Sequence, residues 1–298
     1  NGRTSGGGNY EQVAEYMDIN GNDGWAYMGN DSRELQAKLA WYDYLMSVKE
    51  IPVLNAEDHV IADAAGTIYR EGELTYNIAD IWQGVMHGRA GSALWLWFPT
   101  EIKYSKGAFY ENAVLNARAD YMAEIGKTAL DFRRLAREIA AVNNEKARVG
   151  IIYSDYSLLS DSHYASGMYN AYKEVTYNGE RVRFITETDP RQMLDENLQV
   201  LVIPCCGYMK EGTISLIKEF SKEGKHVILL ECGCGYHEGN GGALSDEANA
   251  VLAGIDTRAK YSHEGQNEVG DSSGAVKKLI ADTLSRLERT IKMCTNGA

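Results

Sequence analysis

Apolar residues recur every three or four positions in three segments of the first half of the chain, 31–48, 74–85 and 110–142. This spacing places the apolar side chains on one face of a helix. Asp31 and Glu34 form a capping-box-like pair at the start of the first segment. We therefore predict three amphipathic helices in this half, the last of them a single long helix.

Short apolar runs lie beside these helices. Residues 52–56 end abruptly in a polar cluster that includes Glu57, and residues 92–98 hold two tryptophans. A further strand is predicted earlier, at 13–19. A polar loop is expected after it, with Asp18, Asn20, Asn22 and Trp25 as residues that line a subsite or simply form the loop.

Strands that alternate with helices and end in polar residues are typical of a (β/α) barrel, where chemistry collects at the carboxyl ends of the strands. We predict that residues 1–143 form the last sector of such a barrel, with strands about six to eight and the final long helix. Glu57 would then be a catalytic carboxylate. The plainer interpretation is a solvated glutamate at a strand end.

The second half of the chain has a different pattern of apolar residues. Val- and Ile-rich runs at 149–153, 182–185, 200–204 and 227–231 alternate with helical segments. Continuous apolar strands of this kind favour a parallel sheet that is covered on both faces. We predict a doubly wound, flavodoxin-like α/β domain at 144–298.

Composition and charge narrow the function classes. The chain has 298 residues, 44% of them hydrophobic and 24% charged, which is ordinary for a globular protein. The net charge of −12 disfavours a nucleic acid or an anionic membrane as partner, because both attract clustered positive charge. The first residues show neither an initiator Met nor a signal-peptide core, so we expect a longer chain, cytoplasmic or periplasmic.

The five cysteines are too few and too irregular for a disulfide framework. Cys205 and Cys206 are adjacent, and Cys232 and Cys234 are too close together for a conventional zinc pair. A glutaminase nucleophile is also disfavoured, because the sequence around Cys205 lacks the Gly-x-Cys-x-Gly elbow. We expect structural thiols. We also expect the Gly-rich segment 233–242 to be a loop that makes oligomer contacts.

Three stretches of the first half resemble a known family: residues 52–59, 82–89 and 92–97. They look like the end of the catalytic barrel of clan A glycoside hydrolases, most of all the β-galactosidase family whose barrel precedes a trimerisation domain. That domain has a glutamine-amidotransferase-like fold. The resemblance implies that Glu57 is the nucleophile and that Trp95 or Trp97 forms the floor of the sugar subsite.

The chemistry of retaining glycosidases fits these residues. Two carboxyl groups about 5 Å apart are needed, one to attack the sugar and one to move the proton. Asn55 and His59 alternate with Glu57 along an extended strand, so all three are expected on one face, where Asn55 and His59 support the carboxylate or bind sugar hydroxyls. Asp58 would point away. No metal or organic cofactor is implied.

One element of the family pattern is missing. The acid/base glutamate of the clan ends the fourth strand and usually follows an Asn, and no Asn-Glu pair precedes Glu57 here. The resemblance therefore implies a β-galactosidase-like enzyme portion that binds a carbohydrate but is inactive alone. A noncatalytic carbohydrate-binding or oligomerisation module is the alternative. The open edge of a partial barrel favours a homo-oligomer.

Overall fold

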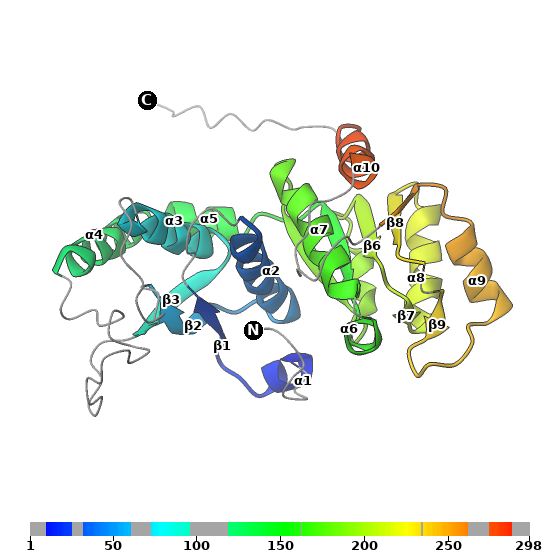
Figure 1. The fold of residues 1–298 in the computed structure, drawn as a ribbon, viewed down its shortest axis with the longest axis horizontal. Coiled ribbons are helices and arrows are strands. Elements are labelled where there is room, and N and C mark those ends of the chain that lie inside the picture. Colours follow the sequence, from blue (N-terminus) through cyan, green and yellow to red (C-terminus); the bar gives the residue numbers. More distant parts are fainter. Residues whose placement is uncertain are drawn as a thin grey trace, which may run out of the picture. The chain divides into compact units, whose positions relative to one another are not determined.

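The computed structural model describes residues 10–25, 32–60, 73–95, 119–161, 163–233, 235–261 and 274–287. The chain divides into two compact units, residues 1–146 and 147–298. Each unit contains its own parallel β-sheet with helices packed against it (Figure 1). The chain is thus an α/β protein with parallel sheets, as the sequence predicts. Among the described residues, no helix is long and apolar enough to cross a membrane.

The first unit has a three-stranded sheet in the order β1-β2-β3, and both strand pairs are parallel. Helices α2 and α3 pack on each other beside the sheet, and α3 also contacts α4 and α5. Val60, Ile81 and Tyr121 form a buried cluster in this unit. The elements are α1 (Tyr10–Glu15), β1 (Asn20–Trp25), α2 (Ser32–Val48), β2 (Val53–His59), α3 (Glu73–Met86), β3 (Arg89–Trp95), α4 (Ala119–Arg134) and α5 (Ala136–Asn143).

The predicted strand at 13–19 is wrong. A short helix, α1, occupies its start, and the strand lies at Asn20–Trp25, in the segment expected to be a loop. This strand has almost no β-forming residues, but it pairs with β2 over its whole length. The buried Asn20 side chain also donates a 3.0 Å hydrogen bond to the Leu45 carbonyl. Pairing and burial decide strand formation here, since β-propensity depends strongly on context.

The prediction of one long helix to residue 142 is also wrong. Residues 110–118 lie outside the described residues, and the remainder forms two helices that meet at Leu135. Leu135 has φ −101° and ψ 15°, away from helical values. Helical hydrogen bonds of 2.9 Å still run from Leu135 N to Asp131 O and from Ile139 N to Leu135 O. The break is therefore a local departure from helical backbone angles at Leu135, with no Pro or Gly there that the sequence could reveal.

The second unit has a five-stranded parallel sheet in the order β10-β8-β6-β4-β5. Counted along the chain, this is the 2-1-3-4-5 order of flavodoxin-like folds. Helices α7 and α10 pack together beside the sheet, and α8 packs with α9 (Figure 1). The main elements are β4 (Val149–Tyr153), α6 (Asp155–Ser160), α7 (Tyr164–Tyr177), β5 (Val182–Thr186), β6 (Val200–Pro204), α8 (Glu211–Lys222), β8 (His226–Glu231), α9 (Asp246–Ala253), β10 (Arg258–Lys260) and α10 (Gly274–Leu284).

A disulfide bond joins the ends of two neighbouring strands of this sheet. Cys205 follows β6 and Cys232 follows β8, and their Cα atoms are 5.2 Å apart. Cys205 has a φ of 50°, a left-handed conformation that is uncommon for a residue with a side chain. Cysteine number and spacing along the sequence did not predict this pair, because the strand order brings the two residues together.

Charged side chains are buried beside β2, where apolar contacts would be usual. Asp58 pairs with Arg89 of β3, and both side chains are almost completely buried. Arg89 Nε also donates to Ser92 Oγ at 2.9 Å. In the helices, Lys38 Nζ lies 2.5 Å from Asp80 Oδ2. Burial raises the pKa of Asp80, an effect that Lys38 opposes.

We predict that replacing Arg89 by Met lowers the free energy of unfolding of the first unit by about 3–5 kcal/mol, because Asp58 becomes an unpaired buried charge. All five tryptophans lie in residues 1–146, so tryptophan fluorescence in urea reports on this unit. The uncharged double variant D58N/R89M should recover most of the loss. Arg134→Met, which removes an exposed pair with Asp131, should change little. Equal losses for R89M and D58N/R89M would contradict the prediction.

Candidate functional site

Three strands bring polar and aromatic residues to one edge of the first sheet. Because β1, β2 and β3 are parallel, their carboxyl ends lie at the same edge. Asp23 of β1 is in register with Glu57 of β2, and His59 of β2 is in register with Trp95 of β3. Residues from three separate segments therefore meet at the strand ends.

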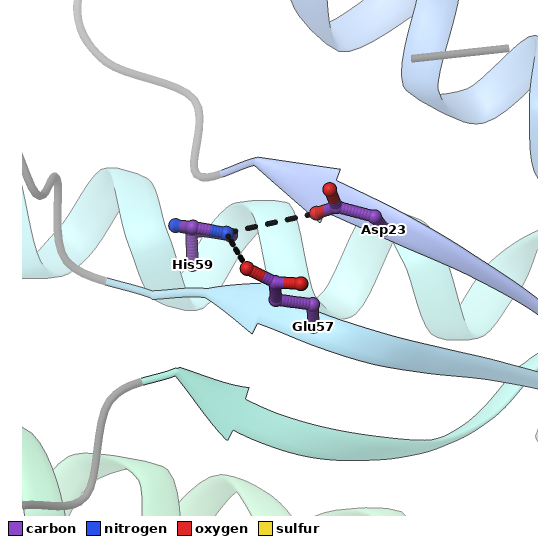
Figure 2. Close-up of side chains that lie close together, drawn as sticks. All are labelled: Asp23, Glu57 and His59. Carbon is purple, nitrogen blue, oxygen red and sulfur yellow. Dashed lines mark hydrogen bonds and ion pairs between the residues drawn. The ribbon is translucent and has the colours of Figure 1, made fainter. Parts of the chain in front are cut away.

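Asp23, Glu57 and His59 point toward one another, as Figure 2 shows. His59 Nε2 lies 3.2 Å from Glu57 Oε1 and 3.6 Å from Asp23 Oδ1. The Glu57 and Asp23 side chains are 41% and 43% exposed, whereas the His59 side chain is 4% exposed. Two accessible carboxylates thus face the same nitrogen of a buried imidazole (Figure 2).

A β-bulge in β2 separates Asn55 from this group. The register of β2 shifts against both neighbours: Asn22↔Asn55 is followed by Asp23↔Glu57, so Ala56 is an extra residue. An extra residue changes which side chains share a face. Asn55 Nδ2 accordingly donates to Asp58 Oδ1 at 2.8 Å.

The predicted alternation of Asn55 with Glu57 therefore fails. Asn55 is fully buried and offers no surface to a ligand, so its place is beside the Asp58–Arg89 pair. Asp58 itself is buried and pairs with Arg89, in agreement with its expected orientation away from Glu57. His59 does contact Glu57, as expected for residues two apart on a strand.

Of the two tryptophans predicted as a sugar floor, Trp95 lies at the end of β3, and Trp97 lies outside the described residues. The Trp95 ring is half-buried, and its centroid is 5.6 Å from that of the His59 ring, with the planes tilted by 35°. Trp95 is thus the described tryptophan that adjoins the carboxylates.

The sequence reasoning missed Asp23. Asp23 could have been found from its position in a strand that pairs with β2. The sequence analysis placed that strand at 13–19, so Asp23 was assigned to no strand. Asp23, Glu57 and His59 also form a group that could hold a metal ion, since each offers a ligand atom within 4.8 Å of the others. Carboxylate and imidazole ligands suit several divalent metals. The same atoms suit acid–base chemistry equally well.

Comparison with solved structures gives three examples of proteins with a similar fold. An exo-carrageenase GH42 from Bacteroides ovatus has a TM-score of 0.65 at 15% identity, over 93% of this chain and 37% of that chain. The β-galactosidase from the psychrophilic Marinomonas ef1 has a TM-score of 0.61 at 12% identity, over 83% of this chain and 41% of that chain. A catalytic mutant of a GH42 β-galactosidase from G. stearothermophilus has a TM-score of 0.58 at 18% identity, over 79% of this chain and 36% of that chain.

No protein-family model matches the sequence, and no curated protein matches it significantly. The chain spans 36–41% of the length of the three structures. At these identities, the likeness concerns the fold. The resemblance to a β-galactosidase family of clan A glycoside hydrolases that the sequence suggested is confirmed at that level.

We predict that Asn55 stabilises the folded structure and does not contact a ligand at the site. Asn55→Ala leaves a buried oxygen of Asp58 without its hydrogen bond, which should lower the free energy of unfolding by about 1–3 kcal/mol. Glu57→Gln alters a partly exposed side chain and should change stability little. Urea unfolding followed by tryptophan fluorescence distinguishes the two variants. A larger loss for E57Q than for N55A would contradict the assignment.

Proposed function

We propose that this chain is part of a retaining glycoside hydrolase that acts on β-galactosides, with Glu57 as the nucleophile. The observation that carries the proposal is the position of Glu57. It is an accessible carboxylate at the carboxyl edge of a parallel sheet, in contact with His59 and near Trp95. In barrel enzymes, the catalytic residues occupy that edge.

The surroundings of Glu57 suit a nucleophilic carboxylate. An ionised carboxylate is stabilised by hydrogen-bond donors, and His59 Nε2 lies 3.2 Å from Glu57 Oε1. Its exposed fraction leaves room for a sugar ring to approach. Attack on the anomeric carbon would form a glycosyl ester with Glu57 and expel the leaving group.

Trp95 provides the apolar contact that a sugar requires. An indole ring stacks against the C–H face of a sugar, and its N–H can bind a hydroxyl. The half-buried Trp95 lies at the end of the strand next to Glu57. We propose that this ring borders the sugar subsite.

The proposal includes the wider architecture. The first unit would be a sector of a (β/α)8 barrel, and the second an amidotransferase-like domain that assembles copies of the protein. The 2-1-3-4-5 strand order of the second unit supports the latter. The similar structures include β-galactosidases, which supports a β-galactoside as substrate.

We predict that a 2-fluoro-β-galactoside with a dinitrophenolate leaving group labels Glu57. This leaving group departs without protonation, so labelling tests the nucleophile separately from any proton donor. The fluorine slows hydrolysis of the ester and lets it accumulate. Peptide mass spectrometry should find one fluorogalactosyl group on the peptide that contains Glu57.

Two variants serve as controls. Glu57→Gln should not be labelled. Glu50→Gln should be labelled as the wild type is, because Glu50 is exposed, precedes the amino end of β2 and pairs with Lys146. Labelling of another residue, or none at all, would overturn the role of Glu57. Galactose binding that persists without labelling would instead indicate a carbohydrate-binding module.

A further inference from the structure

We propose that a cleft in the second unit binds a neutral sugar, separately from the site around Glu57. The cleft has a volume of about 490 Å³, a size that is usual for small-molecule sites. Its walls come from α6, the end of β5, the start of α8 and the loop that carries Glu238 and Asn240. The proposal goes beyond the proposed function, because it does not depend on the role of Glu57.

The cleft lies where the direction of the chain across the second sheet reverses. From β4 the chain passes to β5 on one side, and it then returns to β6 on the other side of β4. The loops after β4 and β6 therefore diverge. Open α/β sheets bind ligands at such a point, outside the carboxyl ends of the strands. Tyr156 follows β4 and Lys210 follows β6, and both line the cleft.

Two connections hold opposite walls of the cleft together. The short strands β7 (Tyr208–Met209) and β9 (His237–Glu238) pair in parallel. The disulfide bond between Cys205 and Cys232 joins the segments that lead into these two strands. The sequence predicted oligomer contacts for the Gly-rich segment 233–242, and in the structure Glu238 and Asn240 of this segment line the cleft.

Hydrogen bonds fix the other walls. Ser157 Oγ donates to the Tyr208 carbonyl at 2.7 Å, which ties α6 to β7. The backbone N–H of Lys210 donates to Glu187 Oε1 at 2.7 Å, which ties the end of β5 to the start of α8. The Glu187 side chain is thus a fixed acceptor, and the residue is only 6% exposed. A site whose walls are already in place loses less entropy when a ligand binds.

Tyr156 gives the cleft an aromatic surface. Its side chain lies in the lining, and the residue is 36% exposed. Gly239 packs against part of the ring, since a Cβ atom at this position would lie only 3.0 Å from a ring carbon. Contact with an aromatic ring favours the C–H face of a sugar, and the Tyr hydroxyl can bond a sugar hydroxyl.

The polar groups of the lining suit hydroxyl groups. Glu187, Glu211 and Glu238 supply carboxylate acceptors, and Lys210 supplies an ammonium donor. Asn240 adds an amide, which both donates and accepts. A sugar hydroxyl also both donates and accepts, so it can bond an acceptor and a donor of this set together. Charges of both signs beside an aromatic ring therefore fit a neutral ligand that carries many hydroxyls.

Other ligand classes fit less well. Three carboxylates in one cleft repel a phosphate or another anion. The turn after β4, Ser154-Asp155, also lacks the glycines of a phosphate-binding loop. Among the described residues, the carboxylates of this cleft are not close enough together to form a metal-binding group. Lys210 Nζ already lies 5.4 Å from the centroid of the Tyr156 ring, the position that an organic cation would take.

The test measures whether a sugar protects Lys210 from acetylation by acetic anhydride. The full 298-residue chain is titrated with galactose, glucose or mannose, and peptide mass spectrometry follows each lysine. At about ten times its dissociation constant, a bound sugar should slow acetylation of Lys210 about tenfold, because only the free protein reacts. Lys218 is the matched control, since it lies on the same helix, is 42% exposed and pairs with Glu247 outside the cleft.

Variants locate the sugar. Tyr156→Ala should raise the concentration for half-protection about tenfold, because the ring supplies the apolar contact. Glu238→Gln replaces an acceptor of a partly exposed side chain without changing its size and should also weaken protection. Tyr177→Ala is the control variant, because Tyr177 is an exposed tyrosine of the same unit outside the cleft. It should bind as the wild type does, and all three variants should keep the wild-type circular dichroism.

The proposal is overturned if none of the three sugars protects Lys210, or if Lys218 is protected equally. Protection by inorganic phosphate or spermidine in place of a sugar would show that the ligand class is wrong. Protection that persists in both Tyr156→Ala and Glu238→Gln would place the sugar outside this cleft.

The same experiment separates this proposal from the proposed function. Glu57→Gln should keep the protection of Lys210, since Glu57 belongs to the first unit. If Lys210 is protected but the fluorosugar does not label Glu57, only the proposed function fails. If Glu57 is labelled but no sugar protects Lys210, only the cleft proposal fails.

Discussion

The parallel pairing of β1, β2 and β3 is the constraint on which the candidate site depends. Parallel strands place all of their carboxyl ends at one edge, so residues from distant segments converge there. The register is equally important, because a slip by one residue turns each side chain to the other face. Asp23 meets Glu57, and His59 meets Trp95, because the observed register aligns each pair.

The buried polar residues beside β2 help to hold this register. Asp58 and Arg89 link β2 to β3, and Asn55 completes the hydrogen bonding of Asp58. Removing charges from water is costly, so a buried ion pair adds little net stability, whereas loss of one partner is strongly destabilising. The pair lies directly after the bulge at Ala56 in β2. It therefore couples the irregular part of the strand to the strand ends that carry Glu57 and His59.

For this protein, the similarity to solved structures is evidence for the fold, and the chemistry of the site is separate evidence for the function. The likeness to GH42 structures concerns the path of the chain, since identity is 12–18%, and a fold alone does not imply a function. The proposal of a glycosidase rests on particular side chains: the accessible carboxylate of Glu57 at a strand end, the His59 imidazole in contact with it and the neighbouring indole of Trp95. The Cys205–Cys232 link and the flavodoxin-like order characterise the second unit independently.

The sequence by itself determined the α/β class, the continuous apolar strands of the second unit, the strand that carries Glu57 and the contact between Glu57 and His59. These features depend on local periodicity, which a single segment records. Tertiary structure alone decided that Asn20–Trp25 is a strand, that Asn55 belongs with Asp58, and that Asp23 faces Glu57. Strand pairing and a bulge are relations between segments, and no residue pattern within one segment encodes the partner that it will meet.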